Sequence, residues 1–135
     1  MAGLLIDSHI FLWLLEAPER LDGALLSRLE DPSERLLLSA ASVWEICIKA
    51  GLGKLMLPRR VAADPEAGFR EALAATRIDL LPIELRHAAA VLALPQRHRD
   101  PFDRLLIAQA LADNLTLVSG DRAFALYENL KLLRA

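Results

Sequence analysis

The sequence predicts an α/β fold with a mostly parallel central sheet of four to five strands, covered by helices on both faces. Short apolar runs alternate along the chain with segments whose apolar residues recur at helical spacing. The runs are too dense in apolar residues for half-exposed strands, so we expect both faces of the sheet to be covered. The chain has 135 residues and no linker-like segment, which predicts one domain over residues 1–135.

The predicted strands are the short apolar runs, of which GLLID is the first. Because helical segments separate the runs, each crossover returns the chain to the same end of the sheet, and parallel pairing is favoured. The run NLKLL is a candidate for a fifth strand. The predicted strands cover residues 3–7, 35–39, 78–83, 115–119 and 129–133.

Proline, glycine and aspartate mark the ends of the predicted helices. Pro18 and Pro95 each end a helix, and Gly51 lies at the end of another. Asp64 and Asp100 are each followed by proline, which is typical of an N-cap and the first helical position. The predicted helices cover residues 8–18, 21–31, 40–53, 64–77, 84–95 and 100–114.

The composition constrains the class of protein only loosely. A formal net charge of −2 does not indicate a nucleic-acid binder, although local basic clusters matter more than the sum. The one cysteine, Cys47, excludes an internal disulfide and fits a reducing compartment. Its neighbours Ile46 and Ile48 predict a packed and unreactive thiol.

The apolar start of the chain, MAGLLIDSHIFLWLL, does not have the pattern of a secretory signal. It lacks lysine and arginine, and Asp7 and His9 interrupt its apolar run. No stretch approaches the roughly 18 uncharged apolar residues that a membrane span needs. We therefore expect a cytoplasmic protein that makes no contact with a membrane.

Four acidic residues are predicted to lie at one edge of the sheet. Asp7 ends the first predicted strand, and Asp121 follows the fourth. Glu45 lies in the helix after the second strand, and Asp103 lies in the first turn of the last helix. In parallel sheets, functional residues gather beyond the carboxyl ends of the strands. We therefore expect the four carboxylates to lie close together.

Carboxylates at such close range repel one another unless a cation neutralises them. Hard divalent ions such as Mg²⁺ or Mn²⁺ take oxygen ligands and need only a few protein carboxylates. A site of this kind can activate water and hold a phosphodiester, as in metal-dependent nucleases.

Each acid also has a structural interpretation. Asp103 could favour the N-terminus of its helix, and Glu45 could form an exposed ion pair with Lys49, four residues later. Asp121 could be a turn residue. Asp7 is the hardest to explain in this way, because an ionisable group inside an apolar run is costly without a partner.

Three stretches of the sequence carry a family resemblance: LLIDSHIFLWLL, LSAASVWEICIKAGLGKLMLP and HRDPFDRLLIAQALADNLTLVSGD. They resemble the PIN-domain family, and within it the VapC-type toxins of bacterial and archaeal toxin–antitoxin pairs. The resemblance extends over nearly the whole chain. It implies a single PIN domain that acts as an endoribonuclease dependent on Mg²⁺ or Mn²⁺.

The resemblance also implies roles for individual residues. The catalytic, metal-binding acids of the family match Asp7, Glu45, Asp103 and Asp121. Ser119 stands where the family often has threonine, and its hydroxyl can still donate to a carboxylate. Our hypothesis is that Asp7 and Asp103 hold the ion, while Glu45 and Asp121 bind it directly, through water, or at a second metal.

Two further residues adjoin the predicted site. Asp100 is expected to cap its helix and, from there, to support the ligands or the substrate indirectly. Arg104 follows Asp103 and is the first candidate for a contact with an RNA phosphate. The other candidates for phosphate contact, each of which has solvated surface as its alternative, are Lys49, Lys54, Arg59, Arg60 and the RHR segment at 97–99.

The aromatic and histidine residues are given structural roles. Trp13 and Trp44 are expected in the core or at an interface, rather than as platforms on which RNA bases stack. The spacing of His9, His87 and His98 does not fit a zinc site.

The resemblance implies three partners. The substrate is expected to be RNA, with tRNA or ribosomal RNA as its class. A second copy of the chain is expected to form a homodimer, and a VapB-like antitoxin is expected to hold the enzyme inactive. The segments IFLWLL and ALLSRL carry more apolar surface than a small sheet can cover, which is consistent with a groove for such a partner.

Other classes fit the sequence less well. A haloacid-dehalogenase-like phosphatase would have a second aspartate two residues after the first, where His9 stands. A receiver domain would have a phospho-acceptor aspartate at the end of a middle strand, and RLLLSAAS has none. Two alternatives stay open: a PIN-fold module that binds RNA or an antitoxin with little catalysis, and a PIN nuclease outside a toxin–antitoxin pair.

Overall fold

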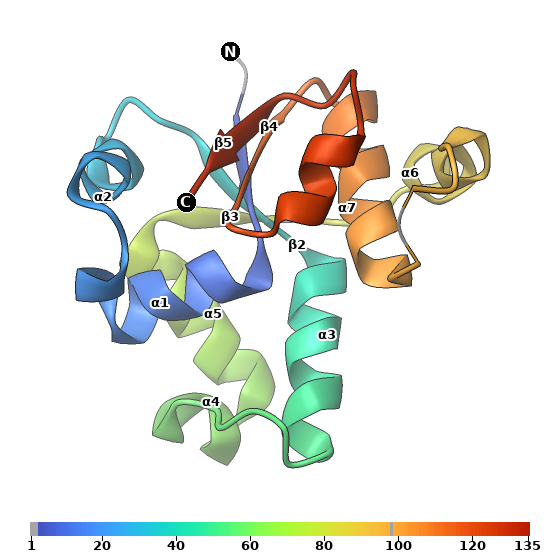
Figure 1. The fold of residues 1–135 in the computed structure, drawn as a ribbon. Coiled ribbons are helices and arrows are strands. Elements are labelled where there is room, and N and C mark those ends of the chain that lie inside the picture. The colour runs from blue at the N-terminus through green and yellow to red at the C-terminus, as the bar shows by residue number, and fades with distance from the viewer. Residues whose placement is uncertain (1–2, 98) are drawn as a thin grey trace.

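Five parallel strands form the central sheet of the computed structural model, which describes residues 3–97 and 99–135 (Figure 1). Their spatial order is β3–β2–β1–β4–β5, and every neighbouring pair is parallel. The predicted class of fold is therefore confirmed. The strands are β1 (Leu4–Ile6), β2 (Leu36–Ser39), β3 (Ile78–Leu81), β4 (Thr116–Ser119) and β5 (Leu132–Arg134).

Helices connect the strands, and most of them lie where the sequence predicts them. The α-helices are α1 (Ser8–Glu16), α2 (Gly23–Glu30), α3 (Ala40–Gly51), α4 (Arg59–Ala63), α5 (Pro65–Thr76), α6 (Leu85–Ala90) and α7 (Pro101–Ala112). Short 3-10 helices are η1 (Pro18–Arg20), η2 (Val91–Ala93) and η3 (Arg122–Leu126).

The sequence did not predict α4, η1 or η3, and the helix expected over residues 84–95 is divided into α6 and η2. These segments have three to six residues each, which is too few for apolar residues to recur at helical spacing. The two predicted aspartate caps are confirmed. The carboxylate of Asp64 accepts from the Ala67 N–H at 3.4 Å, and that of Asp100 accepts from the Phe102 N–H at 2.9 Å.

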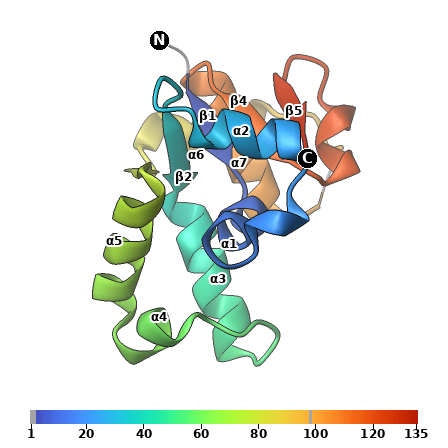
Figure 2. The same ribbon diagram turned by 90° about the vertical axis from the view of Figure 1, so that its left-hand side faces the viewer.

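The alternation of side chains along the strands divides the core between the two faces of the sheet. Leu4 and Ile6 of β1 pack on the face covered by α1, α2 and α5, whereas Leu5 packs on the face covered by α7. Figure 1 and Figure 2 show these helices on opposite sides of the sheet. Full burial of one such leucine contributes about 1.5–3 kcal/mol to folding, so both layers stabilise β1.

The order of the strands places a topological switch point between β1 and β4. The chain proceeds from β1 outward to β2 and β3, and then returns to the other side of β1 to form β4. In sheets of this kind the chain segments that leave the two strands at the switch point diverge, and a crevice beyond their carboxyl ends is the expected place for a ligand. Asp7 follows β1 directly, and its N–H donates to the carbonyl of Val118 in β4 at 3.1 Å.

Cys47, which was expected to be packed, and Trp44, which was expected in the core or at an interface, both lie on the surface. Cys47 is exposed and lines a groove between α3 and α5, so the prediction of a packed thiol is wrong. The side of α3 that faces the core carries Ile46, and Cys47 lies one residue further round the helix. Trp44 is 60% exposed, which excludes a place in the core. Trp13 of α1, by contrast, packs against the core as expected.

No helix in the described part of the chain combines the length and the apolar character needed to cross a bilayer.

Replacement of Gly68 with alanine is expected to destabilise the fold. A Cβ atom at Gly68 would lie 2.5 Å from the Cα of Val61 and 2.8 Å from the carbonyl oxygen of Arg60, so α4 and α5 would have to separate. Overpacking of this kind typically costs about 1–3 kcal/mol, measurable as a lower midpoint in urea denaturation. Gly51→Ala is the matched control, because its added Cβ would meet no atom within 4 Å beyond its chain neighbours and the backbone of its own helix. Equal stability of the two variants would contradict the prediction.

Candidate active site

Asp7 is the central carboxylate of the candidate site. It is only 8% exposed and forms the N-cap of α1, where one carboxylate oxygen accepts from the Ile10 N–H at 2.9 Å. The other oxygen accepts a short hydrogen bond from the Ser119 hydroxyl at the end of β4. Asp7 thus links the carboxyl ends of the two strands that flank the switch point.

Burial raises the pKa of Asp7 above its ordinary value, because the charged form loses its hydration. The hydrogen bonds from Ser119 and Ile10 and the charge of His9 oppose this rise in the pKa, and the negative charge of Glu45 adds to it. The carboxylate is thus held where ionisation is costly, and a nearby cation would favour its charged form.

Glu45 lies beside Asp7, although the two residues are far apart in the sequence. Glu45 is 6% exposed, and the hydroxyl of Ser8 donates to its Oε1 atom at 3.0 Å. The ammonium group of Lys49 lies 3.2 Å from its Oε2 atom. The alternative of an ion pair with Lys49 is therefore correct, but the carboxylate is buried at the sheet edge rather than exposed.

Ser119 joins the first and last of the predicted acids. Its hydroxyl donates to Asp7 and accepts from the N–H of Asp121 at 3.0 Å. Asp121 is exposed and caps η3, where its carboxylate accepts from the Ala123 N–H at 2.9 Å. The interpretation of Asp121 as a turn residue is thus correct as a description of its backbone, and its position still borders the crevice.

Asp103 lies in the first turn of α7, and α7 packs against α3, the helix that carries Glu45. The rings of Trp44 and Phe102, the residues directly before Glu45 and Asp103, meet edge to face with their centroids 5.3 Å apart. This contact brings the N-terminal halves of α3 and α7 together at the carboxyl edge of the sheet.

Hydrogen bonds of two serines link three of the four acids, and the fourth, Asp103, is carried by α7. Asp7 and Glu45 are connected through Ser8, and Asp7 and Asp121 through Ser119. Among residues 3–97 and 99–135, no three His, Cys, Asp or Glu side chains converge as a complete ion site. The donors nevertheless fit a hard divalent ion, because Mg²⁺ keeps several waters and needs only one or two carboxylates.

Arg104 does not take the role that its sequence position predicts. Its guanidinium is buried and donates to the carbonyls of Val91, Leu94 and Pro95 and to the hydroxyl of Tyr127. These bonds use both terminal nitrogens of the buried guanidinium to fix the turn before α7, which is a structural role rather than a contact with an RNA phosphate. Asp100 is confirmed as the helix cap.

His87 has a structural role in this fold. It is fully buried, its Nδ1 atom accepts from the Glu84 N–H at 3.0 Å, and its Nε2 atom lies 2.9 Å from the carboxylate of Asp113. Arg86 completes the group with two bonds to Asp113. This cluster closes α6 against the end of α7. His9 is exposed on α1, and His98 lies outside the described residues.

Comparison with known proteins agrees with this geometry. The model of the family described as PIN domain matches residues 4–130. The chain belongs to the PIN domain family. Ribonuclease VapC22 of Mycobacterium tuberculosis is 32% identical over 123 residues, which cover 90% of this chain and 89% of that protein. The resemblance carried by the three sequence stretches is thus confirmed.

Solved PIN-fold structures share the architecture at low sequence identity. VapBC2 of Rickettsia felis, solved bound to a promoter DNA fragment, has a TM-score of 0.69 at 16% identity, over 97% of both chains. VapBC-1 of Haemophilus influenzae has a TM-score of 0.65 at 19% identity, over 97% of this chain and 96% of that one. FitAcB of Neisseria gonorrhoeae has a TM-score of 0.62 at 21% identity with the same coverage.

Sequence reasoning missed Ser8 in this PIN domain. Its hydroxyl donates to Glu45 across 37 positions of the sequence. One signal was present, because a serine directly after Asp7 must begin α1 at the same edge of the sheet. The partner of its hydroxyl could not be read from that position, since it depends on how α1 packs against α3.

Replacement of Asp7 with asparagine is expected to stabilise the metal-free protein at neutral pH. Because burial raises the pKa of Asp7, the folded protein binds this proton more tightly than the unfolded chain does. The resulting stabilisation is fully present below the ordinary carboxyl pKa of 3.8 and is lost as the pH rises through the raised folded value. Asparagine keeps the helix cap and carries no charge. Thermal unfolding in EDTA at several pH values measures the effect.

The advantage of Asp7→Asn in Tm should shrink as the pH falls toward 3.8, because wild-type Asp7 is then protonated as well. Asp64→Asn is the matched control, since Asp64 is an exposed aspartate cap at another helix. A variant Asp7→Asn that is less stable than wild type at neutral pH would contradict the assignment of burial as the dominant effect.

Proposed function

We propose that this protein is a VapC-like toxin, an endoribonuclease that depends on Mg²⁺ or Mn²⁺ and hydrolyses phosphodiester bonds in RNA. The observation that carries the proposal is the linked set of carboxylates around the switch point, with buried Asp7 at its centre. The family and the ribonuclease relative support the same reaction. The expected substrate class is tRNA or ribosomal RNA, which the enzyme would meet in the cytoplasm.

We assign the cation to the crevice between Asp7 and Asp103, with Glu45 and Asp121 as further ligands, directly or through water. When bound, the cation supplies Lewis-acid activation of the attacking water and neutralises charge on the scissile phosphate. Each carboxylate oxygen has two lone pairs, and the hydrogen bonds from Ile10 and Ser119 leave one on each oxygen of Asp7 for this purpose.

The protein's own residues orient the site. Ser119 prevents the Asp7 side chain from rotating and holds the backbone of Asp121 beside it. Ser8 and Lys49 hold the two oxygens of Glu45, so this carboxylate is suited to orient a water rather than to move toward the ion. Fixed orientation of this kind contributes to catalysis, because the groups need little reorganisation during the reaction.

The nuclease proposal predicts that Asp7→Asn and Asp103→Asn abolish RNA cleavage without unfolding the protein. We expect rates to fall by more than about 100-fold, since loss of even a residue that only supports a metal ligand costs about 10–100-fold. The assay incubates purified, partner-free protein with total tRNA and ribosomal RNA in Mg²⁺, Mn²⁺ or EDTA. Cleavage should require the metal.

Asp64→Asn serves as the control, because it changes an aspartate helix cap outside the site. Full activity of Asp7→Asn would overturn the assignment of the site. Absence of cleavage by folded, metal-loaded wild type would favour the alternative, a PIN-fold module that binds RNA or an antitoxin without cutting.

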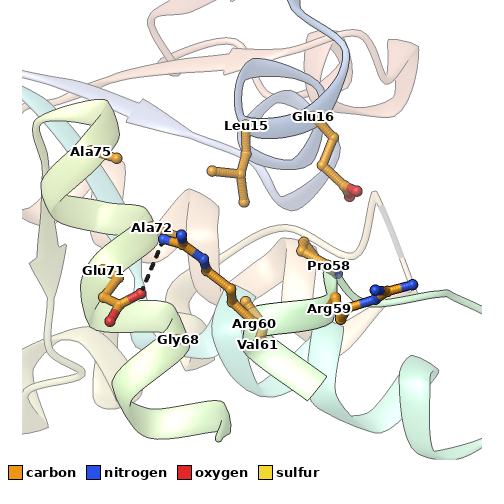
Figure 3. Close-up of a pocket in the computed structure, with 10 residues that line it drawn as sticks. All are labelled: Leu15, Glu16, Pro58, Arg59, Arg60, Val61, Gly68, Glu71, Ala72 and Ala75. Carbon is orange, nitrogen blue, oxygen red and sulfur yellow. Dashed lines mark ion pairs between the residues drawn. The ribbon is translucent and has the colours of Figure 1, made fainter. Parts of the chain in front are cut away.

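For the partner, we propose a VapB-like antitoxin that docks in a cavity of about 290 Å³ between α1, α4 and α5. Figure 3 shows Leu15 and Glu16 of α1 facing Pro58 and Arg60 across this space, with Ala75 on α5. The apolar floor and charged rim suit an amphipathic segment. This supports the groove expected beside the helix IFLWLL. A homodimer is proposed from the family resemblance alone.

The docking proposal predicts that Ala75→Arg weakens binding of the antitoxin by about tenfold or more, the loss typical of a contact near an interface centre. The candidate partner is the product of a small reading frame adjoining this gene, co-purified and titrated by calorimetry. Ala74→Arg is the matched control, because Ala74 is also exposed on α5 but does not line the cavity. Equal affinity of the two variants would exclude this cavity as the docking site.

If no such reading frame adjoins the gene, a PIN nuclease outside a toxin–antitoxin pair would be favoured.

A further inference from the structure

Trp44 is an exposed aromatic side chain beside the acidic edge. Its exposed fraction is 60%, and the one ring contact described for it is with Phe102, at 5.3 Å between centroids and 73° between planes. Tryptophan is usually highly buried, because its large apolar surface is costly to leave in water. The indole thus contacts Phe102 and leaves most of its surface accessible to a ligand.

The position of this aromatic pair relates it to the candidate active site. Trp44 directly precedes Glu45 in α3, and Phe102 directly precedes Asp103 in α7. Both helices begin at the carboxyl edge of the sheet and run away from it, as Figure 1 shows for α3. The pair thus spans the space between two of the four acids.

We propose that Trp44 stacks against an unpaired base of the RNA, next to the phosphate that is cleaved, and that Phe102 positions the indole for this contact. The inference rests on the proposed ribonuclease function and adds to it a subsite for a nucleobase. Proteins recognise single-stranded RNA by splaying its bases onto aromatic rings. Such stacking tolerates different bases, because every base has a π-face.

Cationic side chains on α3 and in the segment before α7 favour RNA over a protein partner. The side chain of Lys49 on the same helix is 42% exposed, and Arg97 and Arg99 are exposed in the segment that leads into α7. Cationic groups beside an aromatic platform are the usual combination in sites for single-stranded nucleic acid. The centre of a protein interface is instead depleted of lysine and glutamate, whereas on α3 Glu45 directly follows Trp44 in the sequence and forms an ion pair with Lys49.

The stacking proposal predicts that RNA quenches the fluorescence of Trp44. The chain has two tryptophans, so Trp13→Phe leaves Trp44 as the one indole emitter and Trp44→Phe leaves Trp13. Each full-length variant is titrated with decaadenylate or decauridylate in Ca²⁺ instead of Mg²⁺, and gels confirm that the RNA stays intact. We expect saturable quenching in Trp13→Phe and little change in Trp44→Phe.

The same proposal predicts weaker RNA binding by Trp44→Ala. Anisotropy of labelled RNA should show a Kd raised by about 5- to 100-fold, the range associated with stacking of one base. Trp44→Leu, which keeps apolar surface without the aromatic ring, should lose nearly as much, and Trp44→Phe should lose less. Leu52→Ala is the matched control, since Leu52 is 65% exposed just beyond the far end of the same helix.

The outcomes separate this proposal from the function on which it rests. Wild type that cleaves RNA, together with Trp44→Ala that binds RNA with wild-type affinity, would overturn the stacking proposal alone. An unchanged RNA affinity with a loss of self-association in Trp44→Ala would assign the residue to a protein interface instead. Wild type that neither binds nor cleaves RNA would overturn both proposals together. Thermal unfolding checks that every variant is folded.

Discussion

The buried carboxylate of Asp7 is the constraint on which the rest of the site depends. A charged group at this depth costs free energy, and the hydrogen bonds from Ser119 and the Ile10 N–H offset only part of that cost. The sheet order makes the position unavoidable, because β1 and β4 both end at the switch point. A fold stabilised by two apolar layers can tolerate such a group, and a protein without a use for it would gain by replacing it.

Much of the fold and the site could be predicted from the sequence because the signals were local. The dense apolar runs predicted β1 and β2, and the aspartate–proline pairs predicted the starts of α5 and α7. Parallel pairing then required Asp7 and Asp121 to lie at one edge of the sheet. The family match adds independent support for the fold, whereas the roles of the four acids remain proposals.

The errors concern properties that depend on how the elements pack. Arg104 adjoins Asp103 in the sequence, but the helix turns its guanidinium inward to carbonyls of η2 and of the turn that follows it. Cys47 lies in an apolar stretch of α3 and was expected to be packed, yet only the side of that helix that carries Ile46 faces the core. No local pattern indicates which face of a helix its neighbours will cover, so Ser8 could not be assigned to Glu45 in advance.

The hydroxyl of Ser119 has a consequence for the order of events during synthesis. It joins residues separated by 112 positions, so the pair cannot form until β4 has left the ribosome and docked beside β1. Until then Asp7 lacks the hydrogen bond from Ser119, and the backbone of Asp121 lacks its bond to the same hydroxyl. The contact between α7 and β4 is also missing. A nascent or truncated chain that lacks β4 therefore also lacks the hydrogen bond that links Asp7 to Ser119. The candidate site is complete only when most of the chain has been made and has folded.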